Sequence, residues 1–496
     1  MLYQSTGGSA ERVTVTRAIT QGLAGDGGLY VPVSLPSVPA DEMTSLVTLP
    51  YAQRATRIMA PFLDGLEPDE LDGYTREAYC VPGFDHPSIA PQHKLDDTTF
   101  FLELWHGPTC AFKDMALQML PRLLKAALRI SGENRDVCIL VATSGDTGKA
   151  ALEGFRDIPG TRIMVFYPRD GVSDVQKLHM ITQEGRNVCV AGVDGNFDDT
   201  QTGVKVIFSD ETLRRELDKN GLFLSSANSI NWGRLLPQIV YYFSAYCDLV
   251  AAGELRAGEP VNFCVPTGNF GNILSAWYAS QMGLPVHKLI CASNCNDVLA
   301  QFLNTGVYDR NRQFYQTVSP SMDILVSSNL ERLLFEASGK DSGLVCRLMR
   351  ELSVTGRYEV PHGIRQETER ILAGGWCTEE DTFKTIAHTY RTYGYLIDTH
   401  TAVGYKVLND YRERTGDMTK TVVVSTASPY KFSNSVLSAL GLACSGNGPG
   451  LIDELCRATG SPVPRPLLRL GEKPVRFSES VAKEGMLQAV RAFCFQ

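Results

Sequence analysis

The stretch VCILVATSGDTGKAALEGF at residues 137–155 decides the fold class of this chain. It begins with a continuous apolar run, which is typical of a strand buried on both faces of a parallel sheet. The small polar turn TSGDTG follows, and a helical pattern begins directly after it. A strand, a tight turn and a helix in this order form half of a βαβ unit, so the sequence predicts an α/β protein.

The same pattern recurs on both sides of this stretch. Helical segments separate the apolar runs, which indicates parallel sheets covered on both faces. One helix with a bend at Pro121 is predicted over 115–130. Further strands are predicted at 28–33, 99–107, 162–168, 187–193, 221–228, 260–266, 287–294 and 421–429.

Charge and composition restrict the possible partners. The 496 residues include 47 Lys and Arg against 55 Asp and Glu, a net charge of −8, and no dense basic stretch. We therefore expect no nucleic-acid partner. With 44% apolar and 21% charged residues, the chain has the composition of a globular protein.

The cysteines and the apolar segments indicate the compartment. Thirteen cysteines form no Cys-x-x-Cys pair, and several lie inside apolar runs, which predicts buried free thiols and no metal site. The longest apolar segment, 239–252, is interrupted by Asp248 and is too short to span a bilayer. The N-terminus lacks the pattern of a secretory signal. We expect a soluble, cytoplasmic protein without membrane contacts.

The turn SGDTGKA at 144–150 is not a nucleotide-binding P-loop. That motif needs four residues between its glycines and a hydroxyl residue after the lysine, and neither condition is met here. Its position after a strand still suits an oxyanion site formed by Ser144, Thr147 and main-chain amides. An ordinary βα turn is the alternative, and spacing alone leaves the two open.

The turn TGNFGN at 267–272 also lacks dinucleotide-binding spacing, because Gly268 and Gly271 bracket only two residues. It can hold one phosphate through consecutive amides at a helix start, with Asn269 and Asn272 as extra donors. The alternative is again a tight turn.

Lys113 stands between apolar neighbours in the segment CAFKDMAL. Desolvation lowers the pKa of such an amine and makes it a nucleophile that can form a Schiff base with a carbonyl cofactor. The alternative is a solvated lysine paired with Asp114.

Two further segments carry polar candidates. In SANSINWGR, Asn228, Asn231 and Arg234 can clamp a phosphate or carboxylate, and a helix-capping role is the alternative. His400 lies near a predicted helix start, where a capping or packing role competes with a catalytic one.

Taken together, the segments GLAGDGGLYVP, ELWHGPTCAFKD, ATSGDTG, SANSINWGRLLPQ, VPTGNFGN, SPSMDILVSSNLERLLF, DTHTAVGY and STASPYKF resemble, in this order, the threonine synthase family of bacterial and fungal type. The resemblance implies a pyridoxal-phosphate enzyme of fold type II, which is α/β and tryptophan synthase β-like. It implies an N-terminal domain over 1–95, a large parallel-sheet domain over 96–135 and 241–496, and a smaller inserted α/β domain over 136–240 that closes over substrate.

The resemblance also implies roles for individual residues. Lys113 matches the catalytic lysine that holds pyridoxal 5′-phosphate. The remaining matches are Gly268, Asn269, Phe270 and Asn272 for the cofactor phosphate, Thr426 for the ring nitrogen, Asp146 near the ring hydroxyl, and Ser144, Thr147, Asn231 and Arg234 for the substrate.

The implied reaction converts O-phospho-L-homoserine and water to L-threonine and phosphate. A phospho-lyase that releases 2-oxobutanoate and a non-catalytic cofactor-binding paralogue are the alternatives. A monomer is expected, with a dimer left open. Gly7, Asn272, Ser428 and Tyr430 depart from the residues that many family members carry at these positions.

Overall fold

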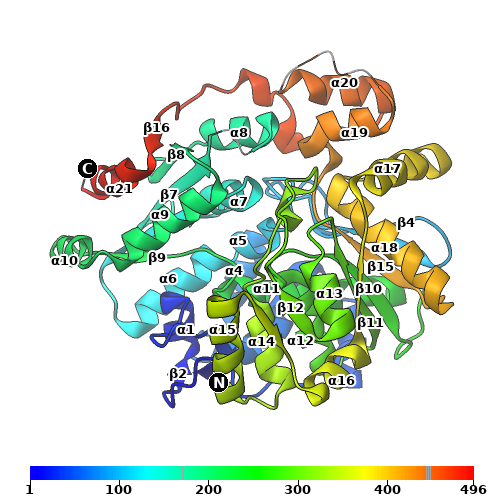
Figure 1. Ribbon diagram of the computed structural model, residues 1–496, viewed down its shortest axis with the longest axis horizontal. Coiled ribbons are helices and arrows are strands. Elements are labelled where there is room, and N and C mark those ends of the chain that lie inside the picture. The colour runs from blue at the N-terminus through cyan, green and yellow to red at the C-terminus, as the bar shows by residue number, and fades with distance from the viewer. Residues whose placement is uncertain (170–171, 443, 445, 447, 496) are drawn as a thin grey trace.

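Two parallel sheets of different size form the framework of this computed structural model, which describes residues 1–169, 172–442, 444, 446 and 448–495 (Figure 1). The α/β class predicted from the sequence is confirmed. Each strand predicted at 99–107, 137–145, 162–168 and onward is present; several are shorter than predicted, and the strands predicted at 162–168, 187–193 and 287–294 begin one residue away from the predicted start.

The larger sheet has six strands in the order β14-β11-β10-β15-β5-β4. All neighbouring strands run parallel except β4 and β5. In the order of the sheet its strands are β14 (Leu372–Trp376), β11 (Val286–Ser293), β10 (Val261–Pro266), β15 (Thr421–Ser425), β5 (Thr99–Glu103) and β4 (Gln92–Lys94).

The smaller sheet has five parallel strands in the order β16-β8-β7-β6-β9. Its strands are β16 (Ser480–Ala482), β8 (Val188–Asp194), β7 (Thr161–Pro168), β6 (Asp136–Ala142) and β9 (Leu222–Ser225). The strand β16 comes from the far end of the chain, so this sheet also draws on residues outside 136–240. Figure 1 shows β16 and the C-terminal helix beside β8 and β7.

The edge strand β14 was not predicted from the sequence LAGGW, because two adjacent glycines disfavour a strand interior. The structure explains them by close packing. A Cβ on Gly374 would lie 2.8 Å from the Ala300 carbonyl oxygen, and one on Gly375 would lie 2.5 Å from Val407 Cγ1. The two glycines let helices approach both faces of this strand.

Helices cover both sheets. The long helix α11 is almost wholly buried and contacts α12 and α3, while α18 packs across β10, β11 and β15. Around the smaller sheet lie α7 (Asp146–Phe155), α8 (Asp174–Ile181), α9 (Phe197–Ser209), α10 (Glu211–Lys219) and α21 (Met486–Cys494). The others of this central and C-terminal region are α5 (Asp114–Leu117), α6 (Leu120–Ser131), α11 (Trp232–Ala251), α12 (Gly271–Gln281), α13 (Val298–Thr305), α14 (Leu330–Ala337), α15 (Ser342–Thr355), α16 (His362–Ile371), α17 (Glu379–Tyr393), α18 (Thr399–Thr415), α19 (Ser433–Ala439) and α20 (Gly450–Thr459).

The single helix predicted over 115–130 is wrong. The structure has a short helix α5 and then a new helix, α6, with Pro121 in its first turn. Proline lacks an amide hydrogen and is tolerated where the first turn of a helix needs none. The residue therefore starts a helix here, where the sequence pattern had suggested a bend.

The N-terminal region is a small layer packed on the larger body. It has a three-stranded antiparallel sheet of order β2-β1-β3, and the Tyr3 ring lies 5.6 Å from that of Trp232, at the start of α11. Its elements are β1 (Leu2–Ser5), β2 (Val13–Thr14), α1 (Val15–Gln21), β3 (Tyr30–Pro32), α2 (Ala40–Val47), α3 (Tyr51–Met59) and α4 (Pro68–Ala78).

A two-stranded ladder pairs β12 (Val307–Asp309) with β13 (Arg357–Glu359).

Among the helices in the described part of the chain, none is both long enough and apolar enough to cross a membrane.

Candidate active site

Lys113 is a buried amine at the start of α5. Its side chain lies above the Phe112 ring, and Nζ is 3.4 Å from Asp146 Oδ2 and 3.3 Å from Ser321 Oγ. Burial lowers the pKa of this amine, against the opposing effect of the Asp146 carboxylate. Lys113 therefore has the apolar surroundings and reduced basicity of an amine nucleophile.

The alternative of a solvated lysine paired with Asp114 is excluded. Both oxygens of that carboxylate accept hydrogen bonds from Thr109, at 2.8 Å from its main-chain N and 2.7 Å from its hydroxyl. Burial raises the pKa of Asp114 to about 6. The Asp114 carboxylate therefore stabilises the turn before Lys113. The carboxylate that contacts the Lys113 amine is that of Asp146, at the start of α7.

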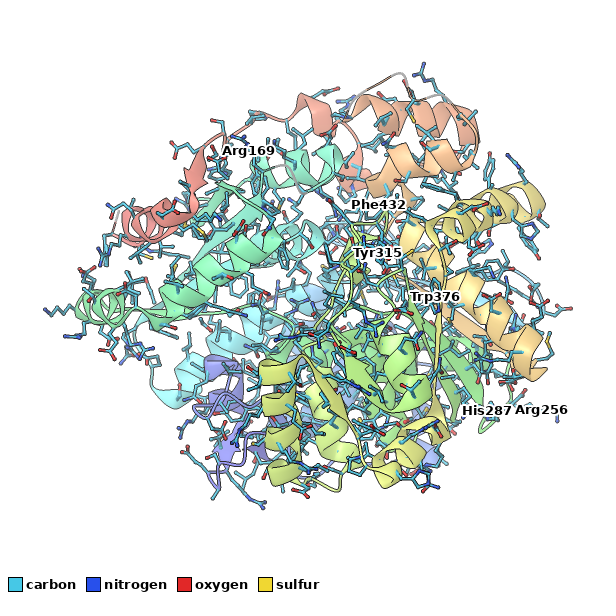
Figure 2. The ribbon with its side chains drawn as sticks, in the orientation of Figure 1. Arg169, Arg256, His287, Tyr315, Trp376 and Phe432 are labelled. Carbon is cyan, nitrogen blue, oxygen red and sulfur yellow. The ribbon has the colours of Figure 1, made fainter. Side chains whose placement is uncertain are left out.

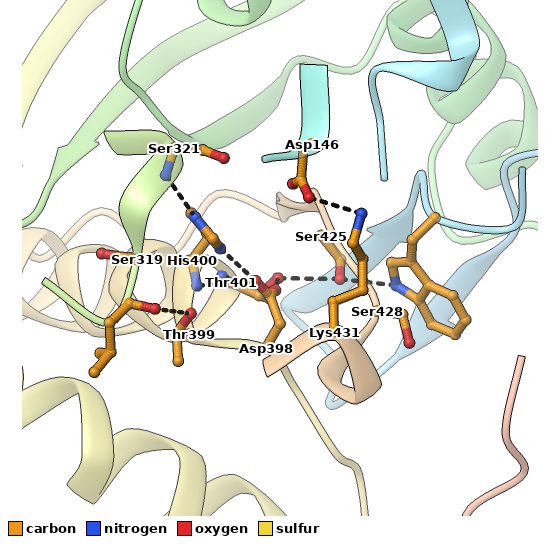
Figure 3. A network of polar contacts seen from close by, with 12 residues as sticks. Asp146, Ser319, Ser321, Asp398, Thr399, His400, Thr401, Ser425, Ser428 and Lys431 are labelled. Atoms are coloured by element: carbon orange, nitrogen blue, oxygen red, sulfur yellow. Dashed lines mark hydrogen bonds and ion pairs between the residues drawn. The ribbon is translucent and has the colours of Figure 1, made fainter. Parts of the chain in front are cut away.

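Asp146 joins three side chains from three parts of the fold. Besides Lys113, its carboxylate contacts Lys431 Nζ at 2.7 Å and Gln176 Nε2 at 2.8 Å, both through Oδ1. Burial alone would raise the pKa of Asp146, but the ammonium groups of Lys431 and Lys113 hold it well below its usual range. Figure 3 shows the Asp146–Lys431 pair.

The turn after β10 presents unpaired main-chain donors. None of the main-chain N–H groups from Gly268 through Ile273 donates to an acceptor in the described part of the chain. Phe270 adopts the left-handed conformation, with φ of 64°, and α12 begins directly after it. Consecutive free N–H groups at a helix start are the ordinary way in which a fold holds a phosphate.

This turn is held in shape by contacts to its carbonyl groups. Asn329 donates to the Asn269 carbonyl from its main-chain N at 3.2 Å and from Nδ2 at 3.0 Å. A Cβ on Gly268 would lie 2.4 Å from the Ser321 carbonyl oxygen, so only glycine fits there. The turn thus keeps its N–H groups free because its oxygens carry the structural bonds.

Asn272 faces inward from the first turn of α12. Its Oδ1 accepts hydrogen bonds from the hydroxyl groups of Tyr241 and Tyr242, the latter at 2.6 Å. Its Nδ2 is buried and has no hydrogen-bond partner within the described chain. A buried donor without an acceptor is costly, so this amide fits an acceptor that binds from outside the chain.

Arg234 is a buried cation whose guanidinium makes one hydrogen bond within the described chain. Its Nη1 donates to the Ala227 carbonyl at 2.9 Å, and its Nε has no partner among the described residues. Burial lowers the pKa of Arg234 to about 10. An enclosed guanidinium with spare donors suits an anionic ligand.

Asn231 has both of its amide atoms engaged in the fold. Its Oδ1 accepts from the Gly233 N–H at 2.9 Å and caps α11, and its Nδ2 donates to the Ile19 carbonyl at 2.9 Å. The capping role left open by the sequence is therefore present. A contact to substrate stays a prediction.

The turn after β6 differs from that after β10. The Thr143 hydroxyl oxygen accepts from the N–H groups of Gly145, at 3.0 Å, and Gly148, at 2.8 Å. The hydroxyl groups of Ser144 and Thr147 are half-buried and make no hydrogen bond within the described chain. These hydroxyls, with the N–H groups at the start of α7, are the donors that this turn offers.

Thr426 lies just beyond the end of β15. Its carbonyl accepts from the Phe112 N–H at 2.8 Å, which ties the segment to the residue before Lys113. Its side chain is buried, and its hydroxyl makes no hydrogen bond with the described residues. The structure therefore brings Thr426, Lys113 and Asp146 into one region.

Sequence reasoning missed several residues of this region. Lys431 is flanked by Tyr430 and Phe432, the same signal of an apolar environment that identified Lys113, and it is buried in the same way. Gln176 carried no signal. Ser321 lies in the segment SPSMDILVSSNLERLLF, which contributed to the resemblance, but it was given no role because it reaches the site only through tertiary structure. Phe432, labelled in Figure 2, contacts the His400 ring edge-on, with ring centroids 4.9 Å apart.

Arg332 is a fully buried residue that links the site to the N-terminal layer. Its guanidinium donates to the carbonyl of Tyr30 at 3.0 Å, to Asn329 Oδ1 at 2.6 Å and to the carbonyl of Ile230 at 2.6 Å. Asn329 in turn holds the Asn269 carbonyl. Arg332 therefore supports the candidate phosphate turn and the segment that carries Arg234.

The donor set fits pyridoxal 5′-phosphate. The Gly268–Ile273 N–H groups and Asn272 Nδ2 suit its phosphate, Lys113 suits its aldehyde, and the Thr426 hydroxyl suits its ring nitrogen. In the described chain, His, Cys, Asp and Glu side chains form no group that could hold a metal ion.

Family models identify the class. The model for pyridoxal-phosphate dependent enzymes matches residues 81–363, and the fold is that of fold type II. The chain is thus a member of the pyridoxal-phosphate dependent enzymes. Models for the N terminus and the C-terminal region of threonine synthase match residues 2–79 and 401–494.

Individual relatives narrow the family. Threonine synthase from Pseudomonas aeruginosa is 41% identical over 88% of this chain and 90% of its own length. The PLP-bound threonine synthase from Brucella melitensis has a TM-score of 0.88 and 37% identity over 100% of both chains, and the yeast enzyme has a TM-score of 0.88 and 31% identity over 99% of this chain and 98% of its own. This chain belongs to the threonine synthase family.

Human threonine synthase-like 1 is also similar, with 42% identity over 86% of this chain. The matched region covers 58% of the length of that relative.

Proposed function

We propose that this protein is a threonine synthase, which converts O-phospho-L-homoserine and water to L-threonine and phosphate with pyridoxal 5′-phosphate. One observation carries the proposal: a buried amine, Lys113, lies in one region with two sets of unpaired anion donors. These are the N–H groups of Gly268–Ile273 and the guanidinium of Arg234. A phosphorylated cofactor and a phosphorylated substrate need two such sets.

The cofactor site is assigned to Lys113, Gly268, Asn269, Phe270, Asn272, Thr426 and Asp146. When bound, pyridoxal phosphate supplies an electron sink that acidifies the C–H bonds beside the substrate's amino group. Thr426 offers a neutral hydroxyl to the ring nitrogen, in place of a carboxylate that would fix a proton there. Asp146, held ionised by two lysines, would lie near the ring hydroxyl of the bound cofactor and could accept a hydrogen bond from it.

Lys113 is assigned the proton transfers. Its lowered pKa leaves a larger share of the amine unprotonated near neutral pH, so Nζ can take a proton from the substrate and return it later. Asp146 and Ser321 hold Nζ in place on two sides. The lysine therefore binds the cofactor and also acts as base and acid.

The substrate anions are assigned to Ser144, Thr147, Asn231 and Arg234. The free hydroxyls after β6 and the start of α7 suit an oxyanion, and Arg234 supplies the formal positive charge. Asn231 acts in this proposal through the position that it gives to the start of α11.

The domain division into 1–95, 96–135 with 241–496, and 136–240 is retained as a proposal. The two separate parallel sheets support it, and the Asp146–Gln176 contact connects the substrate turn to α8 of the smaller sheet. We infer that the smaller sheet moves toward the larger one over bound substrate and excludes water until phosphate has left.

The test is incubation of the purified holoenzyme with O-phospho-L-homoserine. Threonine, 2-oxobutanoate and phosphate are measured together, with Lys113→Ala as control. Threonine and phosphate in equal amounts are expected. Phosphate with 2-oxobutanoate would replace the proposal by a phospho-lyase, and bound cofactor without any phosphate release would replace it by a non-catalytic binding protein.

We also propose a monomeric, cytoplasmic protein. The free thiols support a reducing compartment, because all thirteen cysteines are unpaired and most are buried. Light scattering during size-exclusion chromatography measures the molar mass in solution. The mass of one chain is expected, and the mass of a dimer would contradict the proposal.

A further inference from the structure

Ser321 is the second polar group beside the Lys113 amine. It lies in the short helical turn Pro320–Met322, far from Lys113 in sequence, and its Oγ is 3.3 Å from Nζ. We propose that Ser321 is a further residue of the catalytic site, the hydroxyl partner of the free Lys113 amine, and that the pair His400–Asp398 positions it. The proposal rests on the function proposed above and adds residues to that site.

His400 fixes the main chain of Ser321. The Ser321 N–H donates to His400 Nε2 at 3.2 Å, so this ring nitrogen is an acceptor. The other nitrogen, Nδ1, lies 2.7 Å from Asp398 Oδ2 and donates to this carboxylate, which can only accept. Figure 3 shows the line of contacts from Ser321 through His400 to Asp398.

Asp398 is a rigid anchor for the histidine. It is fully buried and caps α18, where its carboxylate accepts from the N–H groups of His400, at 3.0 Å, and Thr401, at 3.1 Å, and from the Thr401 hydroxyl. The ring of His400 therefore has one orientation, set by the first turn of the helix.

A second contact ties the same helix start to the segment that carries Ser321. The Thr399 hydroxyl donates to the Val318 carbonyl at 2.7 Å. On the other side, Thr401 Oγ1 lies 3.1 Å from the hydroxyl oxygen of Ser425, one residue before Thr426. The start of α18 thus holds the Ser321 turn and the end of β15 at a fixed separation.

The chemistry of a hydroxyl explains why serine suits this position. A carboxylate such as Asp146 only accepts hydrogen bonds, so it favours the protonated amine. A hydroxyl accepts from the ammonium form and donates to the neutral amine. Ser321 can therefore keep Nζ in place in both protonation states, which an amine that takes and returns a proton requires.

The side chain and the main chain of Ser321 have different roles. Its carbonyl oxygen lies where a Cβ on Gly268 would fall, so the backbone also shapes the phosphate turn. Ser321→Ala removes the hydroxyl and keeps that backbone. The charged groups that face Nζ are Asp146, Lys431 and Arg234, and all three are unchanged in this variant.

The first test measures the amine without substrate. We treat three cofactor-free proteins with a trace of amine-reactive reagent across a pH series: the wild type, Ser321→Ala and the control Ser338→Ala. The Ser338 hydroxyl, just after α14, donates to the Phe335 carbonyl. The Lys113 peptide is quantified by mass spectrometry. We expect the half-labelling pH to fall by roughly one unit in Ser321→Ala, because the hydroxyl bonds the charged ammonium more strongly than the neutral amine and its loss therefore destabilises the ammonium form more. The control should match the wild type.

The second test measures the loaded enzyme. We expect kcat of Ser321→Ala to fall roughly ten- to a hundredfold and KM to change less than about threefold, because the hydroxyl contacts the amine. A wild-type labelling profile in a folded Ser321→Ala protein would overturn the assignment, whatever happens to kcat. A failure of the proposed reaction is separate, since the labelling assay contains neither substrate nor cofactor.

The positioning role is tested at His400. His400→Gln keeps an acceptor in place of Nε2, whereas His400→Leu removes it. We expect His400→Leu to reproduce the labelling shift of Ser321→Ala, and His400→Gln to keep a profile close to wild type. If His400→Leu does not fold, His400→Gln decides alone. A full shift in His400→Gln, or none in a folded His400→Leu, would contradict the role.

Discussion

The turn after β10 and the turn after β6 follow the same sequence pattern and differ in their hydrogen bonds. In the first, none of the N–H groups from Gly268 through Ile273 has an acceptor among the described residues, and the turn is held through the carbonyl of Asn269. In the second, the Thr143 hydroxyl takes up the N–H groups of Gly145 and Gly148. The first turn therefore offers a row of consecutive main-chain donors, as the proposed phosphate site requires, and the second offers fewer donors beside a carboxylate.

This difference shows that small residues after a buried strand do not by themselves define an anion site. What matters is whether the turn satisfies its own N–H groups. It also explains how a chain with a net charge of −8 can bind anions, because its donors are concentrated at a few main-chain positions and buried cations.

Lys113 contacts Asp146 of the second turn and Ser321, whose carbonyl oxygen approaches Gly268 of the first, so its replacement should have the largest effect. In Lys113→Ala we expect activity to fall at least about a thousandfold, because the nucleophile and the base are both lost. Borohydride reduction followed by peptide mapping should find no pyridoxyl group on residue 113. Wild-type turnover in this variant would remove the basis of the assignment.

Asp146 distinguishes the second turn from the first through its charge. In Asp146→Asn we expect the free energy of unfolding at neutral pH to fall by about 3 kcal/mol, because Lys113 and Lys431 lose their buried counter-charge. The folded-state pKa of Asp146 lies below its ordinary value of 3.8, so its contribution is complete above that pH and is lost progressively below it.

Denaturant unfolding of wild type and Asp146→Asn over a pH series checks this. The difference in stability should be constant near neutral pH and shrink as the pH falls below 3.8. A difference that stays the same at all pH values would mean that the ionised carboxylate is not its source.

Gly268 tests the first turn alone. In Gly268→Ala the new methyl group would meet the Ser321 carbonyl oxygen at 2.4 Å, and neither backbone can move without the other. We expect cofactor affinity to fall roughly ten- to a hundredfold. Gly363→Ala in α16, where a Cβ has no neighbour within 4 Å, is the matched control. Unchanged cofactor affinity in Gly268→Ala would place the phosphate elsewhere.

Thr143 tests the second turn and should give the smallest effect. Thr143→Val keeps the shape of the side chain and leaves two N–H groups without their acceptor, at a cost of about 1–2 kcal/mol in stability. We expect cofactor affinity to stay within about threefold of wild type. Calorimetric titration with pyridoxal phosphate measures this, and a loss as large as that of Gly268→Ala would mean that both turns hold the same phosphate.

The sequence was sufficient for elements defined by local pattern. Strands such as β6, β7 and β10 are continuous apolar runs, and their position can be read without tertiary structure. The strands β14 and β16 could not be predicted, because one contains two glycines and the other is a short exposed segment that is a strand only because β8 accepts it.

The site divides in the same way. Lys113 and the glycines after β10 have local signals, since an amine among apolar residues and a small-residue turn are visible in sequence. Ser321, Gln176 and Lys431 come from separate elements and meet only in the folded chain. Asn231 shows a different limit of sequence reasoning. Its side-chain amide makes hydrogen bonds within the fold, and the sequence alone could not distinguish this capping role from ligand binding.

The C-terminal return has a consequence for the order of synthesis. The strand β16 completes an edge of the smaller sheet at β8, and Arg162 on β7 donates to the carbonyl groups of Phe493 and Cys494 at 3.1 and 3.0 Å. On the ribosome, β8 emerges almost three hundred residues before β16, its neighbour on the open side of the sheet. A nascent chain therefore carries an open sheet edge at β8 until residues 480–482 have been synthesised and have left the ribosome.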